Sequence, residues 1–164
     1  MKNFEWTTFT RKIAVKSKMS TMYNAWAKPS EIEKWFLSNA DYYDEKQQKT
    51  AKCVNVLKGF SYEWSWYLWG EIEKGKITEA NGKDFIQFTF AGKCLVDINL
   101  SIIDEYTIVV LTQKNIPTDD ESKQNVRLGC HTGWSFYMVN LKSVYEGGLD
   151  LRNKNSKLKG MLNT

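Results

Sequence analysis

The stretch CHTGWSFYMVNLKSVYEGGLDLRNK (residues 130–154) carries a helical pattern that runs into two glycines. Trp134, Met138 and Leu141 recur at spacings of three and four residues, which places them on one face of a helix. The glycine pair at 147–148 supplies the residue type that best accepts the positive φ of a helix end. The stretch therefore predicts a C-terminal helix whose apolar face packs on another layer of structure.

The residues before this stretch extend the same helix. Thr118 and Glu121 form a capping-box pattern, and Asp119 and Asp120 suit the positive end of a helix. The predicted helix spans residues 119–146. At the rise of an α-helix its length is about 40 Å. A helix of this length can lie across a whole curved sheet.

Alternating segments in the middle of the chain predict that sheet. FSYEWSWYLW (residues 60–69) alternates large apolar residues with small or polar ones, which is the period of a half-buried strand. Asn81-Gly82 favours a tight turn between the two strands that follow. Further strands are expected at residues 93–103 and 106–113, so short connections predict an antiparallel meander. Residues 45–58 have no clear period and predict a loop or an irregular edge strand.

The N-terminal part predicts one strand and two short helices. FTRKIAVKS (residues 9–17) has period-2 alternation, with Arg11 as its one flaw on the apolar side. Residues 16–27 and 28–36 have helical spacing, and Pro29 suits the first turn of the second helix. The whole chain therefore predicts an α+β fold, in which a curved antiparallel sheet wraps around a long C-terminal helix.

Composition sets limits on the class of protein. The chain has 164 residues, 42% hydrophobic and 26% charged, which predicts one domain over residues 1–164, with its core at about 8–150 and a short polar C-terminal tail. A net charge of +4 does not by itself predict a nucleic-acid partner. No segment approaches the roughly 18 apolar residues of a membrane span, so no membrane insertion is expected. The N-terminus has no signal-peptide pattern, and three widely spaced cysteines predict reduced, mostly buried thiols in a cytoplasmic protein.

Cys130 and His131 raise the question of catalysis, and the pattern favours packing. Adjacent helical residues point about 100° apart, which does not suit a Cys–His pair. His131 is the only histidine, so a zinc site would need scattered ligands, and no cofactor fingerprint is present. Gly129 and Gly133 predict a close approach of the helix to the sheet. We expect no catalytic residue, no metal and no cofactor.

Aromatic residues are abundant and are the strongest candidates for a site. The chain contains 7 Trp, 8 Tyr and 8 Phe. The apolar faces of the sheet and the helix form either a filled core or a cavity that takes an apolar ligand. For the cavity, the predicted lining residues are Trp35, Trp64, Trp66, Phe88, Phe90, Ile98, Leu111, Trp134, Met138 and Leu141.

Three segments resemble a known family. They are KPSEIEKWF (28–36), TIVVLTQKNIP (107–117) and GWSFYMVNLKSVYEGG (133–148). With the predicted order of elements, they resemble the START-like (SRPBCC, Bet v 1-like) superfamily, and within it the family similar to the activator of Hsp90 ATPase. The resemblance covers about residues 8–150 and implies the helix-grip fold. The insertion at 45–58 and the tryptophan-rich YEWSWYLWGE (62–71) depart from the family pattern.

The resemblance leaves three functions open. The first is a non-enzymatic domain that binds a small hydrophobic ligand, lipid or aromatic, between the sheet and the helix. The second is a co-chaperone-like module that binds an Hsp90-type chaperone, with residues 45–58 as a candidate contact. A cyclase-type enzyme is the third. The sequence also leaves open a homodimer.

Overall fold

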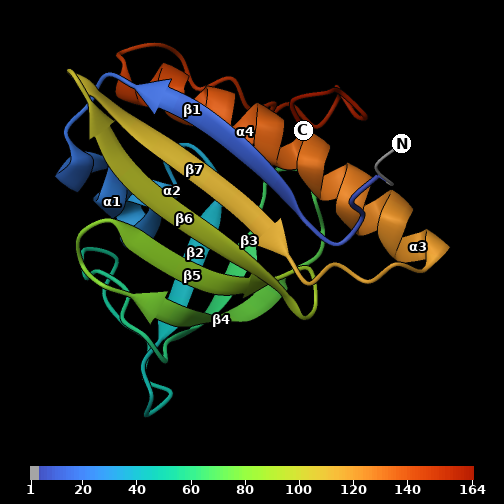
Figure 1. Ribbon diagram of the computed structural model, residues 1–164, viewed down its shortest axis with the longest axis horizontal. Coiled ribbons are helices and arrows are strands. Elements are labelled where there is room, and N and C mark those ends of the chain that lie inside the picture. Colours follow the sequence, from blue (N-terminus) through green and yellow to red (C-terminus); the bar gives the residue numbers. More distant parts are fainter. Residues whose placement is uncertain (1–3) are drawn as a thin grey trace.

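The computed structural model describes residues 4–164, so residues 1–3 of the predicted domain lie outside the described part. Its elements follow the predicted order: one strand, two short helices, a series of strands and a long helical segment (Figure 1). They are β1 (Phe9–Val15), α1 (Met19–Ala27), α2 (Pro29–Ile32), β2 (Asn39–Tyr43), β3 (Ser61–Ser65), β4 (Glu73–Ala80), β5 (Phe85–Phe90), β6 (Cys94–Ile103), β7 (Tyr106–Lys114), α3 (Asp120–Ser122), η1 (Lys123–Leu128) and α4 (Gly129–Tyr145).

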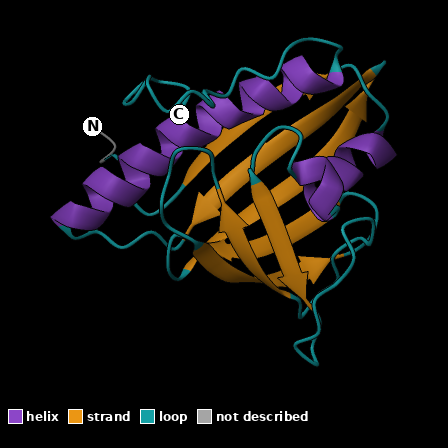
Figure 2. Cartoon of the chain, turned by 180° about the vertical axis from the view of Figure 1, so that it is seen from behind, coloured by secondary structure: helices purple, strands orange, loops and turns teal. Residues whose placement is uncertain are grey.

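The strands form one antiparallel sheet. Within residues 4–164 it has seven strands in the order β1-β7-β6-β5-β4-β3-β2, so β1 is the only strand that pairs out of sequence order. The sheet curves, and α4 crosses its concave side (Figure 2). The predicted α+β fold, with a curved sheet around a long C-terminal helix, is confirmed.

The long helical segment differs in detail from the prediction. Asp119, not Thr118, is the N-cap, because its carboxylate accepts the backbone N–H of Ser122. Residues Lys123–Leu128 then form π-helical turns before α4 begins. The helix ends at Tyr145, close to the predicted end, and Gly147 follows with a φ of 80°. A π-helical insertion widens one turn and often accompanies a functional site.

The core lies between the sheet and the helices. Trp134 of α4 is 2% exposed, and its Nε1 donates to Oε1 of Gln113 on β7 at 2.9 Å. Trp35 is fully buried, and its Nε1 donates to the carbonyl of Ala25 at 2.9 Å. These hydrogen bonds satisfy indole groups that would otherwise be buried without a partner. The helix is thereby fixed on the sheet through aromatic residues, as the periodicity predicts.

Several strand predictions need correction. The strand expected at 60–69 ends at Ser65, and a strand at Asn39–Tyr43 was not predicted separately. Ile102 continues the alternation of Val96, Ile98 and Leu100 on β6, yet it is 61% exposed near the end of the strand. The loop expected at 45–58 is confirmed as largely irregular, although Val56 within it is buried.

The C-terminal residues fold back onto the molecule. Arg152 lies in the segment predicted as a polar tail, yet its side chain is only 4% exposed. Its guanidinium donates to the carbonyls of Glu33, Lys34 and Leu37 at 2.9–3.0 Å. Asp150 forms an ion pair with it at 2.8 Å. One buried arginine therefore ties the tail to the segment after α2, which composition alone did not indicate.

Candidate functional site

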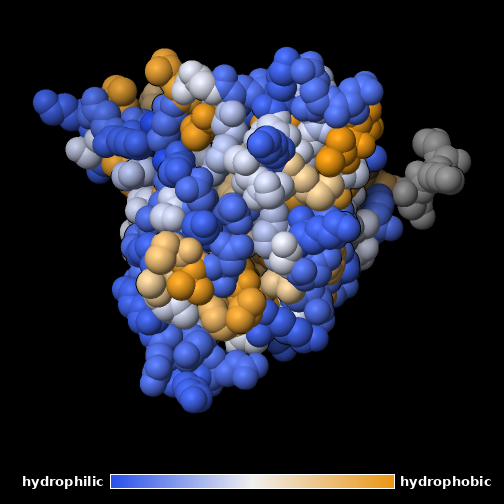
Figure 3. Space-filling model, turned by 90° about the vertical axis from the view of Figure 1, so that its left-hand side faces the viewer, coloured by the Kyte–Doolittle hydropathy of each residue, from blue (hydrophilic) through white to orange (hydrophobic). Residues whose placement is uncertain are grey.

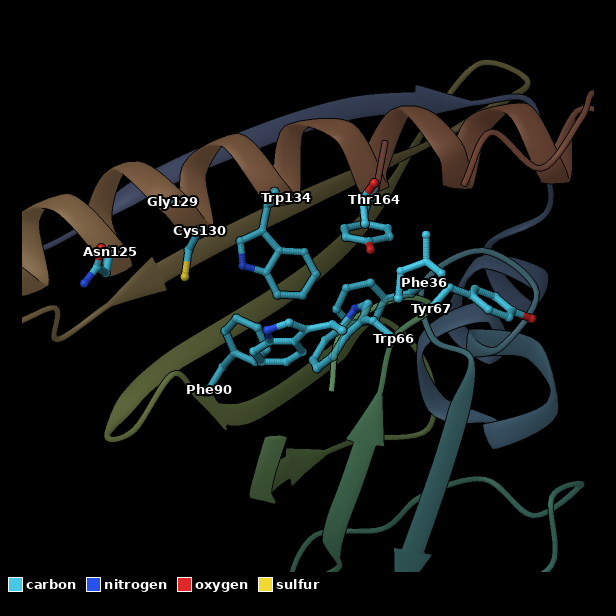
Figure 4. A pocket seen from close by; sticks show the side chains of 13 residues that line it. Phe36, Trp66, Tyr67, Phe90, Asn125, Gly129, Cys130, Trp134 and Thr164 are labelled. Carbon is cyan, nitrogen blue, oxygen red and sulfur yellow. The ribbon is translucent and has the colours of Figure 1, made fainter. Parts of the chain in front are cut away.

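A cleft lies between α4 and the connection from β3 to β4. Its volume is about 370 Å³, within the range of small-molecule sites. Thirteen residues line it, and Figure 4 shows Cys130 and Trp134 pointing from the helix toward Phe90 and Trp66. The lining residues are Phe36, Trp66, Tyr67, Leu68, Trp69, Phe90, Asn125, Gly129, Cys130, Gly133, Trp134, Tyr137 and Thr164.

Aromatic rings form most of the cleft wall. Trp66 contacts Phe36, Trp69 and Phe90 edge to face, with ring centroids 5.0–6.3 Å apart. Phe36 in turn stacks on Trp134 at 4.9 Å. Edge-to-face and offset contacts of this kind stabilise aromatic clusters beyond the area they bury. The rings thus hold one another in place around the open volume.

The connection after β3 brings four side chains to the cleft, from Trp66 to Trp69. β3 ends at Ser65, and Leu68 adopts a φ of 62°, which is uncommon for a residue with a branched side chain. Leu68 is 40% and Trp69 is 49% exposed, so large apolar side chains stand at the mouth of the cleft. No Gly or Pro occurs between Ser65 and Leu68 to indicate the turn. The strand was therefore predicted too long.

Two glycines on the helical wall correct another prediction. Gly129 and Gly133 were expected to let the helix approach the sheet. A Cβ at Gly133 would meet no atom within 4 Å, and one at Gly129 would meet only the carbonyl of Gln124, at 3.7 Å. Both residues line the cleft instead. Their missing side chains leave open volume rather than a close contact.

Cys130 and His131 lie in different surroundings. The Cys130 side chain points toward the cleft, and burial raises the pKa of its thiol to about 11. His131 packs its ring edge-on against Phe9 at 5.3 Å and lies 3.4 Å from the Arg11 guanidinium. Burial, together with Arg11 and Arg127, lowers the pKa of His131 below its ordinary value. The two residues therefore do not form a nucleophile–base pair in this geometry.

The carboxylates on and beside the sheet do not form a pair. Glu73 on β4 is half-buried and accepts the backbone N–H of Ala91 at 2.7 Å, and burial raises the pKa of its carboxyl. Glu71 lies before the strand and is exposed. Asp97 pairs with Lys114 at 2.6 Å across neighbouring strands. In residues 4–164 no group of three or more His, Cys, Asp or Glu is arranged to hold a metal ion.

The ten predicted lining residues fall into two groups. Trp66, Phe90 and Trp134 line the cleft. The other seven lie in the packed core and do not line it: Trp35, Trp64, Phe88, Ile98, Leu111, Met138 and Leu141, each 2% exposed or less. Strand alternation and helical spacing correctly placed these seven residues inside, but neither pattern indicated where the interior ends.

The tail contributes the last part of the cleft. Thr164 lines it, and the Asn153 side chain donates to the carbonyl of Leu158 at 2.5 Å and to Thr164 Oγ1 at 3.3 Å. Tyr67 at the rim lies over the cations of Arg152 and Lys154, at 5.2 and 4.9 Å. Cation–π contacts thus join the tail to the rim of the cleft. Nothing in the tail's polar composition indicated this role.

A profile of the family described as "Activator of Hsp90 ATPase homolog 1-like protein" matches residues 16–146. The chain belongs to this family. Among proteins with curated descriptions, none matches the chain. The matched segment runs from the end of β1 to the end of α4 and so includes most of the cleft.

Solved structures show the same fold at low sequence identity. The Aha1 dimer from Colwellia psychrerythraea is 17% identical, with a TM-score of 0.65 over 86% of this chain and 97% of that one. Protein SSP2350 from Staphylococcus saprophyticus is 18% identical, with a TM-score of 0.67 over 88% and 96%. The AHSA1-like protein from Aeromonas hydrophila is 17% identical, with a TM-score of 0.61 over 85% and 92%. At these identities the likeness establishes the fold and no more.

Within residues 4–164, no helix has both the length and the apolar character that crossing a membrane requires. The face of the molecule seen in Figure 3 is mostly hydrophilic, with hydrophobic side chains gathered in small separate patches. Cys53 is exposed, Cys94 is buried and Cys130 is partly buried, and all three are free thiols. The expectation of mostly buried cysteines is thus wrong for Cys53.

Proposed function

We propose that this family member is a non-enzymatic domain that binds a small hydrophobic ligand in the cleft between α4 and the β3–β4 connection. The observation that carries the proposal is an open volume of about 370 Å³ whose walls include Trp66, Trp69, Phe90 and Trp134. Small-molecule sites are concave and mostly apolar, with a few polar groups for orientation. Asn125 and Thr164 are polar groups of that kind here.

Binding without catalysis is supported by the state of the reactive groups. A raised pKa keeps the Cys130 thiol protonated near neutral pH, and a thiol is a much weaker nucleophile than a thiolate. The nearest partner of His131 is the Arg11 guanidinium, which cannot accept a proton from it. The cleft therefore offers apolar contact area but no activated nucleophile.

Tryptophan fluorescence tests the proposal. A panel of small hydrophobic molecules, including an alkanol and a fused-ring aromatic, should quench or shift the emission of Trp66 and Trp69 and raise the melting temperature. Trp69→Ala should weaken binding with little loss of stability, because this side chain is already 49% exposed. Ile102→Ala is the matched control, since Ile102 is 61% exposed and does not line the cleft. No response to any member of the panel would reject the proposal.

A chaperone-binding function is the second candidate, and the family's description favours it. The lysines of residues 45–58 are partly neutralised within the chain, since Lys52 pairs with Glu33 at 2.5 Å and with Asp41 at 3.1 Å. Val54 and Leu57 in the same loop are 44% and 58% exposed and are better contact candidates. A purified Hsp90-type chaperone should show faster ATP hydrolysis with the wild-type chain than with Leu57→Glu. An unchanged rate with the wild type would exclude this candidate.

Oligomeric state and location belong to the same proposal. The Aha1 protein from Colwellia psychrerythraea was solved as a dimer, which supports testing a homodimer of this chain by sedimentation equilibrium. A monomer across the micromolar range would reject it. Three free thiols, one of them exposed, are consistent with a reducing cytoplasm.

A further inference from the structure

Neither backbone conformation nor packing requires glycine at positions 129 and 133 on the cleft wall. Gly129 has helical angles, with a φ of −63°, and Gly133 lies inside α4 with no positive φ. A glycine within a helix makes the helix less stable than an alanine would, by about 1 kcal/mol at each position. The reason is that glycine has more backbone conformational freedom to lose on folding. Neither glycine makes room for a packed neighbour. Packing and backbone geometry therefore leave the choice of glycine unexplained.

Both glycines line the cleft, and their lack of side chains affects its open volume. Because they are four residues apart on a helix, they lie one turn above the other on the same face. Any side chain at Gly133 would occupy the volume that is now open. On the helical wall the positions of Gly129 and Gly133 are therefore bare backbone, bordered by the side chains of Cys130 and Trp134, and the rings of Trp66 and Phe90 lie across the cleft from them.

The ring of Trp66 lacks a parallel neighbour. Its ring contacts in the described chain are with Phe36, Trp64, Trp69 and Phe90, and all have interplanar angles of 65–83°. Offset parallel stacking is the other favoured geometry of aromatic pairs. A flat molecule in the cleft can make a stacked contact with this ring.

Within residues 4–164, the side chains that line the cleft carry no charge. In the described part of the chain no Lys, Arg, Asp or Glu lines the cleft. Its polar side-chain groups belong to Asn125, Tyr67, Tyr137, Cys130 and Thr164 and to the indoles of Trp66, Trp69 and Trp134. Burying an ionised ligand group without a partner of opposite charge is costly. The lining therefore suits a neutral molecule that carries at most a few hydrogen-bonding groups.

Building on the proposed function, we propose that the ligand is a flat, uncharged fused-ring aromatic molecule that lies between Trp66 and the bare backbone at Gly129 and Gly133. The two glycines then act as specificity-determining residues. A side chain at either position narrows the cleft from the helix side. A puckered ring system or a coiled alkyl chain is thicker than an aromatic plane and fits this space less well.

A matched pair of probes tests flatness. 2-Naphthol and decahydro-2-naphthol share one carbon skeleton and one hydroxyl group, but only the first is planar. Titration calorimetry and tryptophan fluorescence should give 2-naphthol at least about a tenfold lower Kd than the saturated probe. 1-Dodecanol serves as the extended-chain probe and should also bind more weakly than 2-naphthol.

Substitutions test the role of the glycines. Gly133→Ala and Gly133→Leu should weaken 2-naphthol binding progressively, with the leucine variant losing at least about tenfold. The alanine variant should melt at or above the wild-type temperature, so weaker binding cannot be attributed to unfolding. Thr132→Ala is the matched control, because Thr132 is exposed on the neighbouring position of the same helix. It should raise helix stability and leave both Kd values unchanged.

The two proposals fail in different ways. Equal affinity for both naphthol probes, or a Gly133→Leu variant that binds 2-naphthol as the wild type does, would overturn the flat-ligand inference and leave hydrophobic binding in place. Binding of none of the three probes would overturn both. Tight 2-naphthol binding that Gly133→Leu abolishes and Thr132→Ala preserves would support both.

Discussion

Trp64 and Trp66 are two residues apart in the same sequence pattern, yet they occupy different environments. Trp64 is 1% exposed, stacks on Tyr62 at 3.9 Å and donates its Nε1 to the Tyr42 hydroxyl at 3.1 Å. Trp66 lies past the end of β3, is only partly buried and makes edge contacts alone. One ring completes the core, and the other borders an open volume. The same residue type thus completes the core in one place and lines a cleft in the other.

The largest expected effect separates the core from the cleft. Trp64→Ala should lower the free energy of unfolding by about 3–5 kcal/mol, as removal of a buried ring typically does. Trp69→Ala, at the mouth of the cleft, should cost less than about 1 kcal/mol, because half of that ring is already in water. Urea denaturation of both variants gives the comparison. If both variants lost a similar free energy of unfolding, Trp69 would contribute to stability as a core residue does.

The sequence predicted the core better than the cleft for a physical reason. Period-2 and helical patterns report which side of an element faces inward, and Trp64, Phe88 and Trp134 follow them. These patterns do not report where a strand stops. At Leu68 the chain turns with a φ of 62°, and no glycine or proline between Ser65 and Leu68 indicates this turn in the sequence. Nor do they show that Gly133 faces empty space rather than a neighbour. Cleft geometry depends on such gaps between elements, which leave no periodic signal.

The tail offers the second comparison, between two cations near one aromatic ring. Arg152→Met removes hydrogen bonds to three carbonyls and should cost about 2–3 kcal/mol, because those buried acceptors lose a charged donor. Lys154→Met is the control, since Lys154 is 48% exposed and its ion pair with Asp150 should contribute less than about 1 kcal/mol. Urea melts measure both variants. Equal stability of the two would mean that the tail is not held by Arg152.

Loss of the Arg152 anchor should also be visible at the cleft. Tyr67 then loses one of its two cations, and Thr164 loses the fixed segment that carries it. We expect faster tryptic cleavage at Lys157 and Lys159 in Arg152→Met than in Lys154→Met. The fluorescence emission of the buried Trp64 should remain unchanged. The loosening of the tail is then confined to the rim of the cleft.

Acid should act on the tail through Asp150. Burial alone would raise the pKa of this carboxyl, but hydrogen bonds from Arg152, Lys154 and Asn140 outweigh burial and hold the pKa well below its ordinary value. A lowered pKa adds stability that is present above the unfolded-state pKa of about 4 and is lost as the pH falls below it. The stability gap between wild type and Asp150→Asn should therefore be widest at neutral pH and shrink below about pH 4. Thermal melts from pH 7 to pH 2 test this, and a constant gap would contradict it.

The smallest expected effect concerns the three thiols, which sample the surface, the cleft and the core. Cys53 is exposed, Cys130 borders the cleft and Cys94 is 1% exposed. A thiol-specific disulfide reagent at pH 8 should therefore label Cys53 first, Cys130 more slowly and Cys94 last. Burial raises the pKa of Cys130 to about 11, so little thiolate is present at pH 8 and its labelling rate should still rise with pH beyond that.

The labelling rates of the three thiols distinguish the cleft from the core in the folded protein. Cys130→Ala should cost little stability and remove only the intermediate phase, which assigns it. A ligand in the cleft should slow labelling of Cys130 and leave Cys53 unchanged, because Cys53 does not line the cleft. Cys94 is protected by the packed interior rather than by the ligand, so its rate should follow global unfolding. If Cys94 reacted as fast as Cys130, the open volume would extend into the sheet, and the boundary drawn between Trp64 and Trp66 would be wrong.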